Sequence, residues 1–244
     1  SQSAMSLHWE VPGGAISIGL DPLSSVFVVI LSIVTIAAAL YGREYLSHEG
    51  AGSQARAWCY YNLLAASMLA VLVARNGLFF LIVWEIMSIS SLMLVLHDHK
   101  EKSVREAGWI YFVAAHAGSA FLIPLFLLLG KHAGTFELSA IAPHAIGGQF
   151  ATVLFILSVI GFGCKAGFMP FHVWLPEAHP AAPSHVSALM SGVMIKMGIY
   201  GILRILTLLS APPVSWGLIL ILIGLISGIM GITLALCQHD IKRL

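Results

Sequence analysis

Long runs of apolar residues set the strongest limit on what this chain can fold into. We identify about seven of them, each near the ~20 apolar residues that a helix needs to cross a bilayer core. They cover residues 23–42, 57–74, 77–97, 107–130, 149–169, 184–209 and 215–236. Because backbone polar groups find no water inside lipid, each run must form its own hydrogen bonds as a helix. The sequence therefore predicts an all-α polytopic membrane protein with about seven transmembrane helices.

The composition supports a membrane protein and argues against a soluble domain. Charged residues make up 9% of the chain and hydrophobic residues 59%, whereas a soluble domain carries about 25% charged residues. A net charge of +1 lacks the basic excess of nucleic-acid-binding proteins. The three cysteines lie far apart within apolar runs, without metal or disulfide spacing. We expect the bilayer as a partner, and neither nucleic acid, nor a metal, nor a cofactor.

Lysine and arginine are distributed unequally between the two predicted faces. One face carries Arg43, Arg56, Lys100, Lys102, Arg105, Lys242 and Arg243. The other carries Arg75, Lys131 and Arg204. Since cytoplasmic loops carry the positive excess, the first face should be cytoplasmic. We expect a multi-pass protein of the inner (plasma) membrane with its C-terminal end in the cytoplasm. Residues 1–22 would then form an extracytoplasmic lead-in, with room for a small hairpin.

Three formal charges fall inside predicted spans, on Glu85, Lys165 and Lys196. Each would cost at least ~2.5–3.5 kcal/mol at the bilayer centre without compensation. Glu85 and Lys196 lie ~12 and ~18 Å from the nearer ends of their spans, too far for their side chains to reach water. The amine of Lys165 has an alternative, because Pro170 lies five residues further on and the chain could open there. We predict buried ionisable groups that hold and release protons, although a purely structural ion pair is the alternative.

Three histidines are candidate proton carriers beside these charges. His116 is in the middle of a span, His172 follows Lys165 by seven residues, and His185 precedes Lys196 by eleven. Both spacings place a histidine on the same helix face as the lysine if the helix is continuous. Imidazole titrates near neutral pH, which suits proton transfer. The alternative for each is a histidine that only hydrogen-bonds within the bundle.

Prolines and glycines mark irregular or closely packed places. The prolines between residues 169 and 183 rule out one continuous helix there, and the segment is too apolar for an ordinary loop. We predict a broken helix that re-enters near the membrane face, with a Pro-rich connecting loop as the alternative. Gly224 and Gly228 form a G-x-x-x-G pattern, which favours close helix packing in the last span.

Several stretches of this sequence resemble a known family. They are Phe79–Ser88 with its Trp-Glu pair, Gly161–Pro183, Val186–Leu189, Met194–Tyr200 and Gln238–Leu244. These are similar to antiporter-like proton-channel subunits of complex I, multi-subunit sodium/proton antiporters and membrane-bound hydrogenases. The Phe-His-x-Trp-Leu-Pro-Glu-Ala-His version at residues 171–179 is most similar to the large membrane subunit of hydrogenase-4 and formate hydrogenlyase complexes.

The resemblance implies an organisation and a set of roles. Residues 23–56 would be a first transmembrane helix with a cytoplasmic loop, and 57–209 a five-helix proton-channel unit of an inverted repeat with broken helices. Residues 210–244 would begin a second unit, so we expect a piece of a longer protein. Glu85 would be the carboxylate partner, Lys165 the switching lysine and Lys196 the central lysine that passes the proton onward.

The function implied is proton translocation in a redox-driven complex. Partners would be other membrane subunits and a peripheral redox or hydrogenase arm, since the sequence shows no catalytic redox site. Two alternatives stay open: a sodium/proton antiporter module, and a membrane anchor for a hydrogenase arm that moves nothing. A Lys196→Ala substitution should separate them, because an anchor would lose no pumping.

Overall fold

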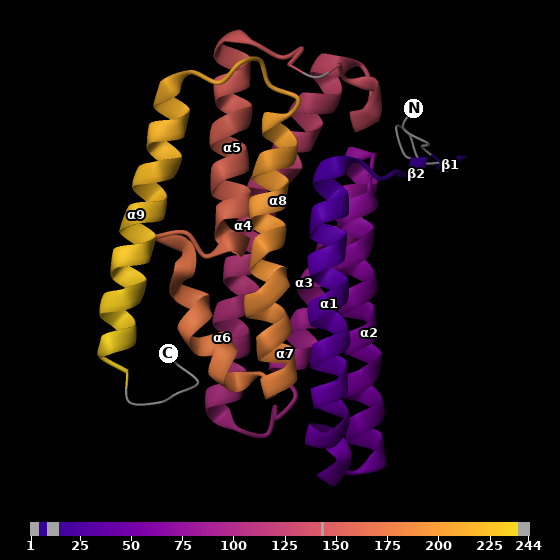
Figure 1. Cartoon of the computed structure of the whole chain (residues 1–244), viewed down its shortest axis with the longest axis vertical. Coiled ribbons are helices and arrows are strands. Elements are labelled where there is room, and N and C mark those ends of the chain that lie inside the picture. The colour runs from indigo at the N-terminus through magenta and orange to yellow at the C-terminus, as the bar shows by residue number, and fades with distance from the viewer. Residues whose placement is uncertain (1–4, 9–14, 143, 239–244) are drawn as a thin grey trace.

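The computed structural model describes residues 5–8, 15–142 and 144–238, and nearly all of them are helical. Seven helical stretches within it are long and apolar enough to cross a membrane, which confirms the predicted fold class. They are Pro22–His48, Ala51–Val73, Gly77–Val95, Lys102–Ala133, Gly148–Ala181, Ser184–Leu206 and Val214–Leu236. Figure 1 shows them side by side, with α9 (Val214–Leu236) at one edge and α1 (Pro22–Tyr45) and α2 (Ala51–Val73) at the other.

A short hairpin precedes the bundle, as the sequence suggests. Strands β1 (Met5–His8) and β2 (Ala15–Ile18) pair antiparallel. The hairpin is tied to the turn between α2 and α3 (Gly77–Val95), because the Arg75 amide donates to the Ser17 carbonyl at 2.8 Å. α1 then begins at Pro22, and the Asp21 side chain caps it by accepting from the Ser24 amide at 2.8 Å.

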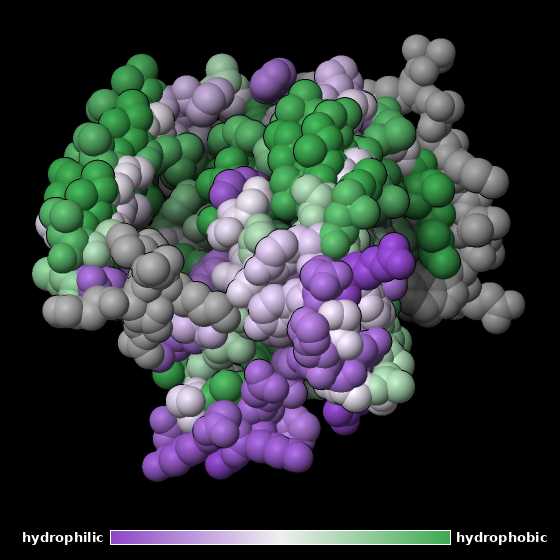
Figure 2. Space-filling model, turned by 60° about the horizontal axis from the view of Figure 1, so that its bottom comes forward, coloured by the Kyte–Doolittle hydropathy of each residue, from purple (hydrophilic) through white to green (hydrophobic). Residues whose placement is uncertain are grey.

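The two ends of the bundle differ in the number of lysine and arginine residues that they carry, although acidic residues accompany these at both ends. We call one the basic end, because it carries Arg43, Arg56, Lys100, Lys102 and Arg105. It holds the short helix η1 (Leu46–His48) and the turn at residues 96–101 that leads into α4 (Lys102–Ala133). Figure 2 shows hydrophilic residues gathered at this end and hydrophobic ones over the flanks. The opposite end carries the hairpin, the α2–α3 turn and the segment with helix η2 (Leu138–Ala140).

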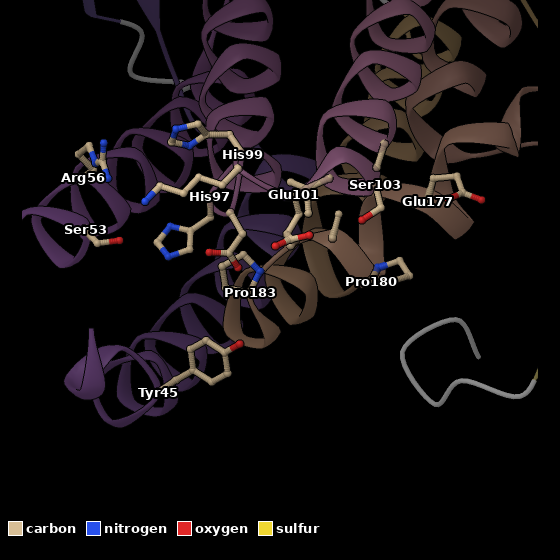
Figure 3. Close-up of a pocket in the computed structure, with 16 residues that line it drawn as sticks. Tyr45, Ser53, Arg56, His97, His99, Glu101, Ser103, Glu177, Pro180 and Pro183 are labelled. Carbon is tan, nitrogen blue, oxygen red and sulfur yellow. The ribbon is translucent and has the colours of Figure 1, made fainter. Parts of the chain in front are cut away.

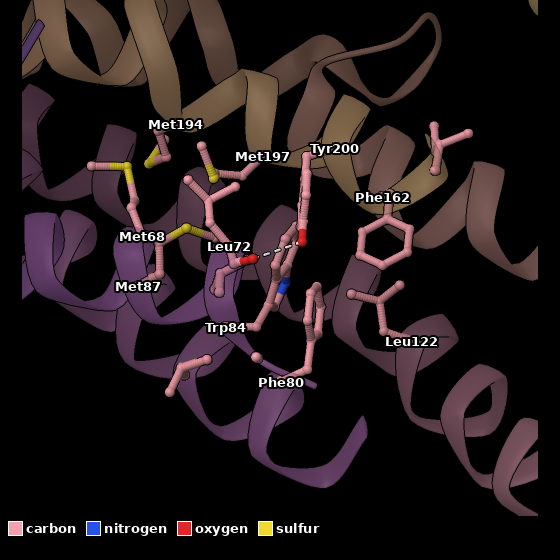
Figure 4. Packing of buried hydrophobic residues seen from close by; sticks show 14 of the residues in the cluster. Met68, Leu72, Phe80, Trp84, Met87, Leu122, Phe162, Met194, Met197 and Tyr200 are labelled. Atoms are coloured by element: carbon pink, nitrogen blue, oxygen red, sulfur yellow. Dashed lines mark hydrogen bonds between the residues drawn. The ribbon is translucent and has the colours of Figure 1, made fainter. Parts of the chain in front are cut away.

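Apolar and aromatic side chains fill the contact between α3, α5 (Gly148–Ala166) and α8 (Ile195–Leu206). Trp84 and Phe162 meet edge to face, with ring centroids 5.2 Å apart, and both are buried. Figure 4 shows this cluster with the Tyr200 hydroxyl donating to the Leu72 carbonyl at 2.9 Å. Helix α9 is different, since Trp216 is its one buried residue in the described chain.

The predicted break is present, and it consists of short helices rather than a loop. α5 ends at Ala166 and is followed by Gly167, whose positive φ of 71° suits glycine. The chain continues as η3 (Phe171–Trp174) and α6 (Leu175–Ala181), then turns into α7 (Ser184–Leu189). The Trp174 indole donates to the Cys164 carbonyl at 2.9 Å, which pins the broken piece back onto α5. A π-helical stretch, η4 (Met190–Met194), joins α7 to α8.

Glycine allows α5 and α8 to pack closely. A Cβ at Gly198 would lie 2.5 Å from the Phe162 carbonyl oxygen and 2.7 Å from the Ala166 amide nitrogen, and neither backbone atom can rotate away. The predicted packing at Gly224 and Gly228 is not made within the described chain, where neither has an atom within 4 Å of such a Cβ. The G-x-x-x-G spacing indicates a face that permits close packing, but not the helix that uses it.

These glycines give a matched stability test. Gly198→Ala should destabilise the bundle by about 1–3 kcal/mol, because two backbones must separate to admit one methyl group. Gly224→Ala should leave stability unchanged or raise it by up to about 1 kcal/mol, because alanine favours the helix. Thermal unfolding in detergent micelles would measure both. Equal effects of the two substitutions would contradict the close contact.

Candidate functional site

Lys165 lies near the end of α5 and is buried, with a relative exposure of 3%. Its amine donates to the Tyr111 hydroxyl at 2.7 Å and to the Ser88 hydroxyl at 3.2 Å. The same amine lies 5.2 Å from the centre of the Tyr111 ring. Lys165 therefore points into the bundle, between α3 and α4, and not toward the break that follows α5.

A buried hydrogen-bond chain extends from this amine. The Tyr111 hydroxyl and the Ser91 hydroxyl are 2.6 Å apart, and the Ser91 hydroxyl also contacts the Met87 carbonyl at 2.8 Å. The Tyr111 ring is held edge to face against Trp174, with centroids 5.0 Å apart. Tyr111 is thus locked by packing while its hydroxyl bridges Lys165 and α3. Hydroxyl groups both donate and accept, so such a chain can carry a proton as well as hold a side chain.

Glu85 makes its contact on another face of the bundle. Its carboxylate oxygen lies 3.5 Å from His116 Nε2, and the two side chains are 34% and 40% exposed. A ring nitrogen of His116 also lies 2.9 Å from the Phe112 carbonyl. The pair sits beside a cavity of about 510 Å³ whose other walls are mainly apolar residues of α3 and α4. The predicted spans bring Glu85 and His116 together, although the sequence did not pair them.

The structure places the three charged residues on different sides of the bundle. Among the ion pairs of the described chain, Glu85 is joined to His116 and not to Lys165. Of the three predicted charges only Lys165 is buried by this chain, since Glu85 is partly exposed and Lys196 is exposed. Position along a span gives depth in the membrane, but it does not give the side of the helix on which a residue lies.

Lys196 lies on the outer side of α8. Its amine donates a short hydrogen bond to the carbonyl oxygen of Ser191, in the π-helical stretch below it. It also lies close enough to His179 to interact electrostatically. A ring nitrogen of His179 is in turn 3.0 Å from the Ser187 hydroxyl. Lys196 is therefore linked to the broken segment by polar groups rather than by a carboxylate.

His172 faces a cavity of about 520 Å³ between the broken segment and α9. The cavity is also lined by His179, Ser187, Ser191 and Ser227. His172 Nδ1 is buried and has no hydrogen-bond partner among the described residues. The break between Lys165 and His172 changes the direction of the chain, so their seven-residue spacing does not set a common helix face.

His185 is buried to 1% relative exposure, at the start of α7. Neither of its ring nitrogens has a hydrogen-bond partner in the described part of the chain. It faces α1 and α2, whereas Lys196 is exposed, so the predicted common face is wrong. The cause is the π-helical stretch between them, since a π turn holds more residues than an α turn and rotates the residues after it.

A second buried polar cluster was missed by the sequence analysis. At the end opposite the basic end, Arg204 forms a two-pronged ion pair with Asp21, and one of its bonds measures 2.9 Å. Arg75 lies 3.5 Å from the same carboxylate, and both arginines donate to the Ser24 hydroxyl, at 3.1 and 2.9 Å. The Tyr200 hydroxyl completes the cluster, 3.0 Å from Arg204.

This cluster sets the ionisation of its carboxylate. Burial would raise the pKa of Asp21, but the hydrogen bonds from Arg204 and the Ser24 amide, with the charges of Arg204 and Arg75, outweigh it. They hold the pKa of Asp21 well below its usual range. The one available sequence signal was Arg204 near the end of an apolar span with no nearby acid, because its partner lies 183 residues away.

The described residues contain no group of three or more histidine, cysteine or acidic side chains that could hold a metal ion.

Comparison with known proteins identifies the class to which this fold and site belong. Residues 74–244 match the family model for the membrane domain of NADH:quinone oxidoreductase and Mrp antiporter subunits. That match covers more than half of the chain, so the chain belongs to this family.

Three proteins show which members of this family the chain resembles. Hydrogenase-4 component B of Escherichia coli is 42% identical over 233 residues, covering 94% of this chain and 34% of that protein. Formate hydrogenlyase subunit 3 of the same organism is 29% identical, over 92% of this chain and 35% of that protein. The Mrp complex from Dietzia superposes with a TM-score of 0.90 at 28% identity, covering all of this chain and 27% of that one. The chain thus spans about a third of the length of these relatives, which are subunits of multi-subunit membrane complexes.

Proposed function

We propose that this chain is a proton-translocating unit of a redox-driven membrane complex of the hydrogenase or complex I type. The observation that carries the proposal is the buried Lys165 amine, bonded to two hydroxyl groups and to no carboxylate within the described chain. A charged amine in a fixed structural role usually has an acidic partner. Hydroxyl partners accept a bond from the charged amine and donate one to the neutral amine, so both states can be accommodated.

The other ionisable groups lie on two sides of Lys165. The Glu85–His116 pair is on the α3–α4 face, and Ser88 lies one helical turn beyond Glu85. On the other side, His172, His179 and Lys196 surround or adjoin the cavity beside α9. We infer that protons move between these groups through Lys165, with cavity water bridging the gaps that side chains do not span.

The partners are inferred from the relatives. Hydrogenase-4, formate hydrogenlyase and Mrp proteins are components of larger assemblies. We infer that this chain sits in the plasma membrane with its basic end in the cytoplasm, beside other membrane subunits. A peripheral redox or hydrogenase arm would supply the driving reaction.

Lys196 gives a test that separates pumping from anchoring. In the protein reconstituted into sealed lipid vesicles, Lys196→Ala should lower proton flux driven by a potassium diffusion potential by about tenfold or more. Its side chain is exposed and bonds to one backbone carbonyl, so assembly and thermal stability should stay unchanged. Lys102→Ala, at an exposed lysine of the basic end, should have no effect on flux and is the matched control.

A flux unchanged in Lys196→Ala would favour the anchor over the pump. The same vesicles, tested with and without sodium, separate the remaining alternative. Proton flux that requires a sodium gradient would identify an antiporter module and contradict the redox-driven assignment.

A further inference from the structure

A polar cavity of about 700 Å³ opens at the basic end, between the 96–101 turn and the end of α6. Ionisable residues of both signs line it: Arg56, His97, Asp98, Lys100, Glu101 and Glu177. Figure 3 shows Ser53, Arg56 and His97 on one side of this cavity, and Ser103 and Glu177 on the other. Carboxylates and imidazoles at a wet cavity wall can exchange protons with water, which a purely apolar wall cannot do.

His97 connects this cavity to a carboxylate behind it. Its Nε2 lies 2.9 Å from each oxygen of Glu49, and its side chain is 7% exposed. Glu49 lies between α1 and α2 and also accepts from the Ser53 hydroxyl at 2.6 Å. Burial raises the pKa of Glu49, but the bonds from Ser53 and His97 and the nearby histidine charges outweigh it and lower the pKa. The pair thus holds one carboxylate and one titratable ring in direct contact.

His185 lies behind this pair, enclosed by aromatic rings. The ring centroids of Tyr45, Tyr61 and Trp58 are 5.6, 5.9 and 6.2 Å from its own. Tyr45 also lines the cavity, so a single ring separates the cavity from His185. On the α1 side the wall is Gly42, where a Cβ would lie 2.8 Å from His185 Cδ2. Glu49 and His97 are the two ionisable groups that act on His185 electrostatically.

The buried ring of His185 has no protein partner within the described residues for either nitrogen. An unsatisfied buried polar group costs about 1–3 kcal/mol, so a ring kept only for packing would be better replaced by leucine or phenylalanine. The ring also stands two residues before Ser187, whose hydroxyl is 3.0 Å from His179 in the second cavity. Helix α7 therefore carries His185 on the side of Tyr45 and the basic-end cavity, and Ser187 on the side of the second cavity.

We propose that the basic-end cavity is a proton-collecting entrance, in which the Glu49–His97 pair takes protons from water and passes them to His185. From His185 they would reach the His179–Ser187 pair and the cavity beside Lys196. This inference rests on the proposed function, and it adds the uptake side that the central residues do not provide. The step is a proton transfer alone, from hydronium to carboxylate or imidazole, and it requires no oxidant or reductant.

The test uses reconstituted vesicles in which the basic end faces the solution whose pH is varied. Glu49→Gln and His97→Gln keep a hydrogen-bonding side chain at each position, and His185→Leu removes a ring that has no bond to lose. Glu49→Gln and His97→Gln should lower proton flux about tenfold at pH 8, where protons are scarce, and approach the parent rate at pH 6. His185→Leu should lower the flux at both pH values with an unchanged unfolding temperature, because it removes the enclosed relay and not the collecting pair. Glu106→Gln is the control, because it removes a carboxylate that is 64% exposed and does not line this cavity.

A folding defect would lower flux equally at both pH values, so rescue at pH 6 distinguishes proton collection from a structural role. If all three variants keep the parent flux at pH 8 while Lys165→Met still loses it, the proposed entrance is wrong and the proposed function stands. Flux that survives Lys165→Met would instead overturn the proposed function. Flux equally low at both pH values in Glu49→Gln and His97→Gln would also overturn the entrance, as a structural effect.

Discussion

Replacing Lys165 with methionine should bring proton flux down to that of empty vesicles. Methionine matches the length of the lysine stem, so the site stays filled, but it carries no group that can hold a proton. Removing a group that transfers protons typically lowers the rate 10²–10⁴-fold. Because Lys165 is the one central carrier of the proposed pathway, this loss amounts to nearly the whole proton flux. The dye-monitored flux of reconstituted vesicles under an imposed potential would measure the loss.

Tyr111, the hydroxyl partner of Lys165, allows two checks of this prediction. In Lys165→Met the Tyr111 hydroxyl keeps its contact with Ser91, so the bundle should fold and unfold at a similar temperature. Tyr111→Phe keeps the ring against Trp174 and removes the hydroxyl alone. We expect it to lower flux by about tenfold, less than the loss of the amine itself. Flux at the parent level in Lys165→Met would show that protons take another route.

The second large effect should come from Arg204, and it should be a loss of stability. Arg204→Leu removes the two-pronged partner of Asp21 and leaves the carboxylate buried beside Arg75 alone. Breaking a buried ion pair in this way costs about 3–5 kcal/mol. Thermal unfolding in detergent would detect it. Lys102→Ala is the control, because its pair with Glu106 is 83% and 64% exposed and should contribute under about 1 kcal/mol.

The same cluster predicts a pH dependence with a definite sign. The pKa of Asp21 is held well below its usual range in the folded chain, against about 3.9 for an unfolded aspartate. Its contribution to stability is therefore complete above about pH 4 and is lost as the pH falls below that value. Arg204→Leu should unfold with a weaker dependence on acid in that range. An unchanged acid dependence would mean that the pair is not what stabilises the carboxylate.

The apolar runs predicted the number and type of helices well, but not where every helix begins. We predicted a fourth span over 107–130, whereas α4 covers Lys102–Ala133. Lipid contact demands apolar residues only in the middle of a span, and a helix can extend into the charged headgroup region without any signal in the hydropathy. The break after α5 could be predicted because proline and glycine act on the local backbone.

The site was predictable in its residue types but not in its pairings. A lysine inside a span is costly wherever it points, so Lys165 could be singled out by sequence alone. Its partner Tyr111 could not be chosen, because many hydroxyl groups stand at suitable depth. The pairing of Arg204 with Asp21 joins opposite parts of the chain, and the face of Lys196 depends on a π-helical stretch. Both are set by tertiary packing.

The sparse attachment of α9 has a mechanical consequence. This helix is held by the stacking of Trp216 on Phe155, at 4.3 Å, and by the Met169 amide that donates to Ser227, while most of its surface faces outward. The cavity beside His172 has α9 as one wall. The width of this cavity therefore depends on the position of a helix that few contacts hold in place. A shift of α9 by a fraction of a helix diameter would change the volume available to water beside His172.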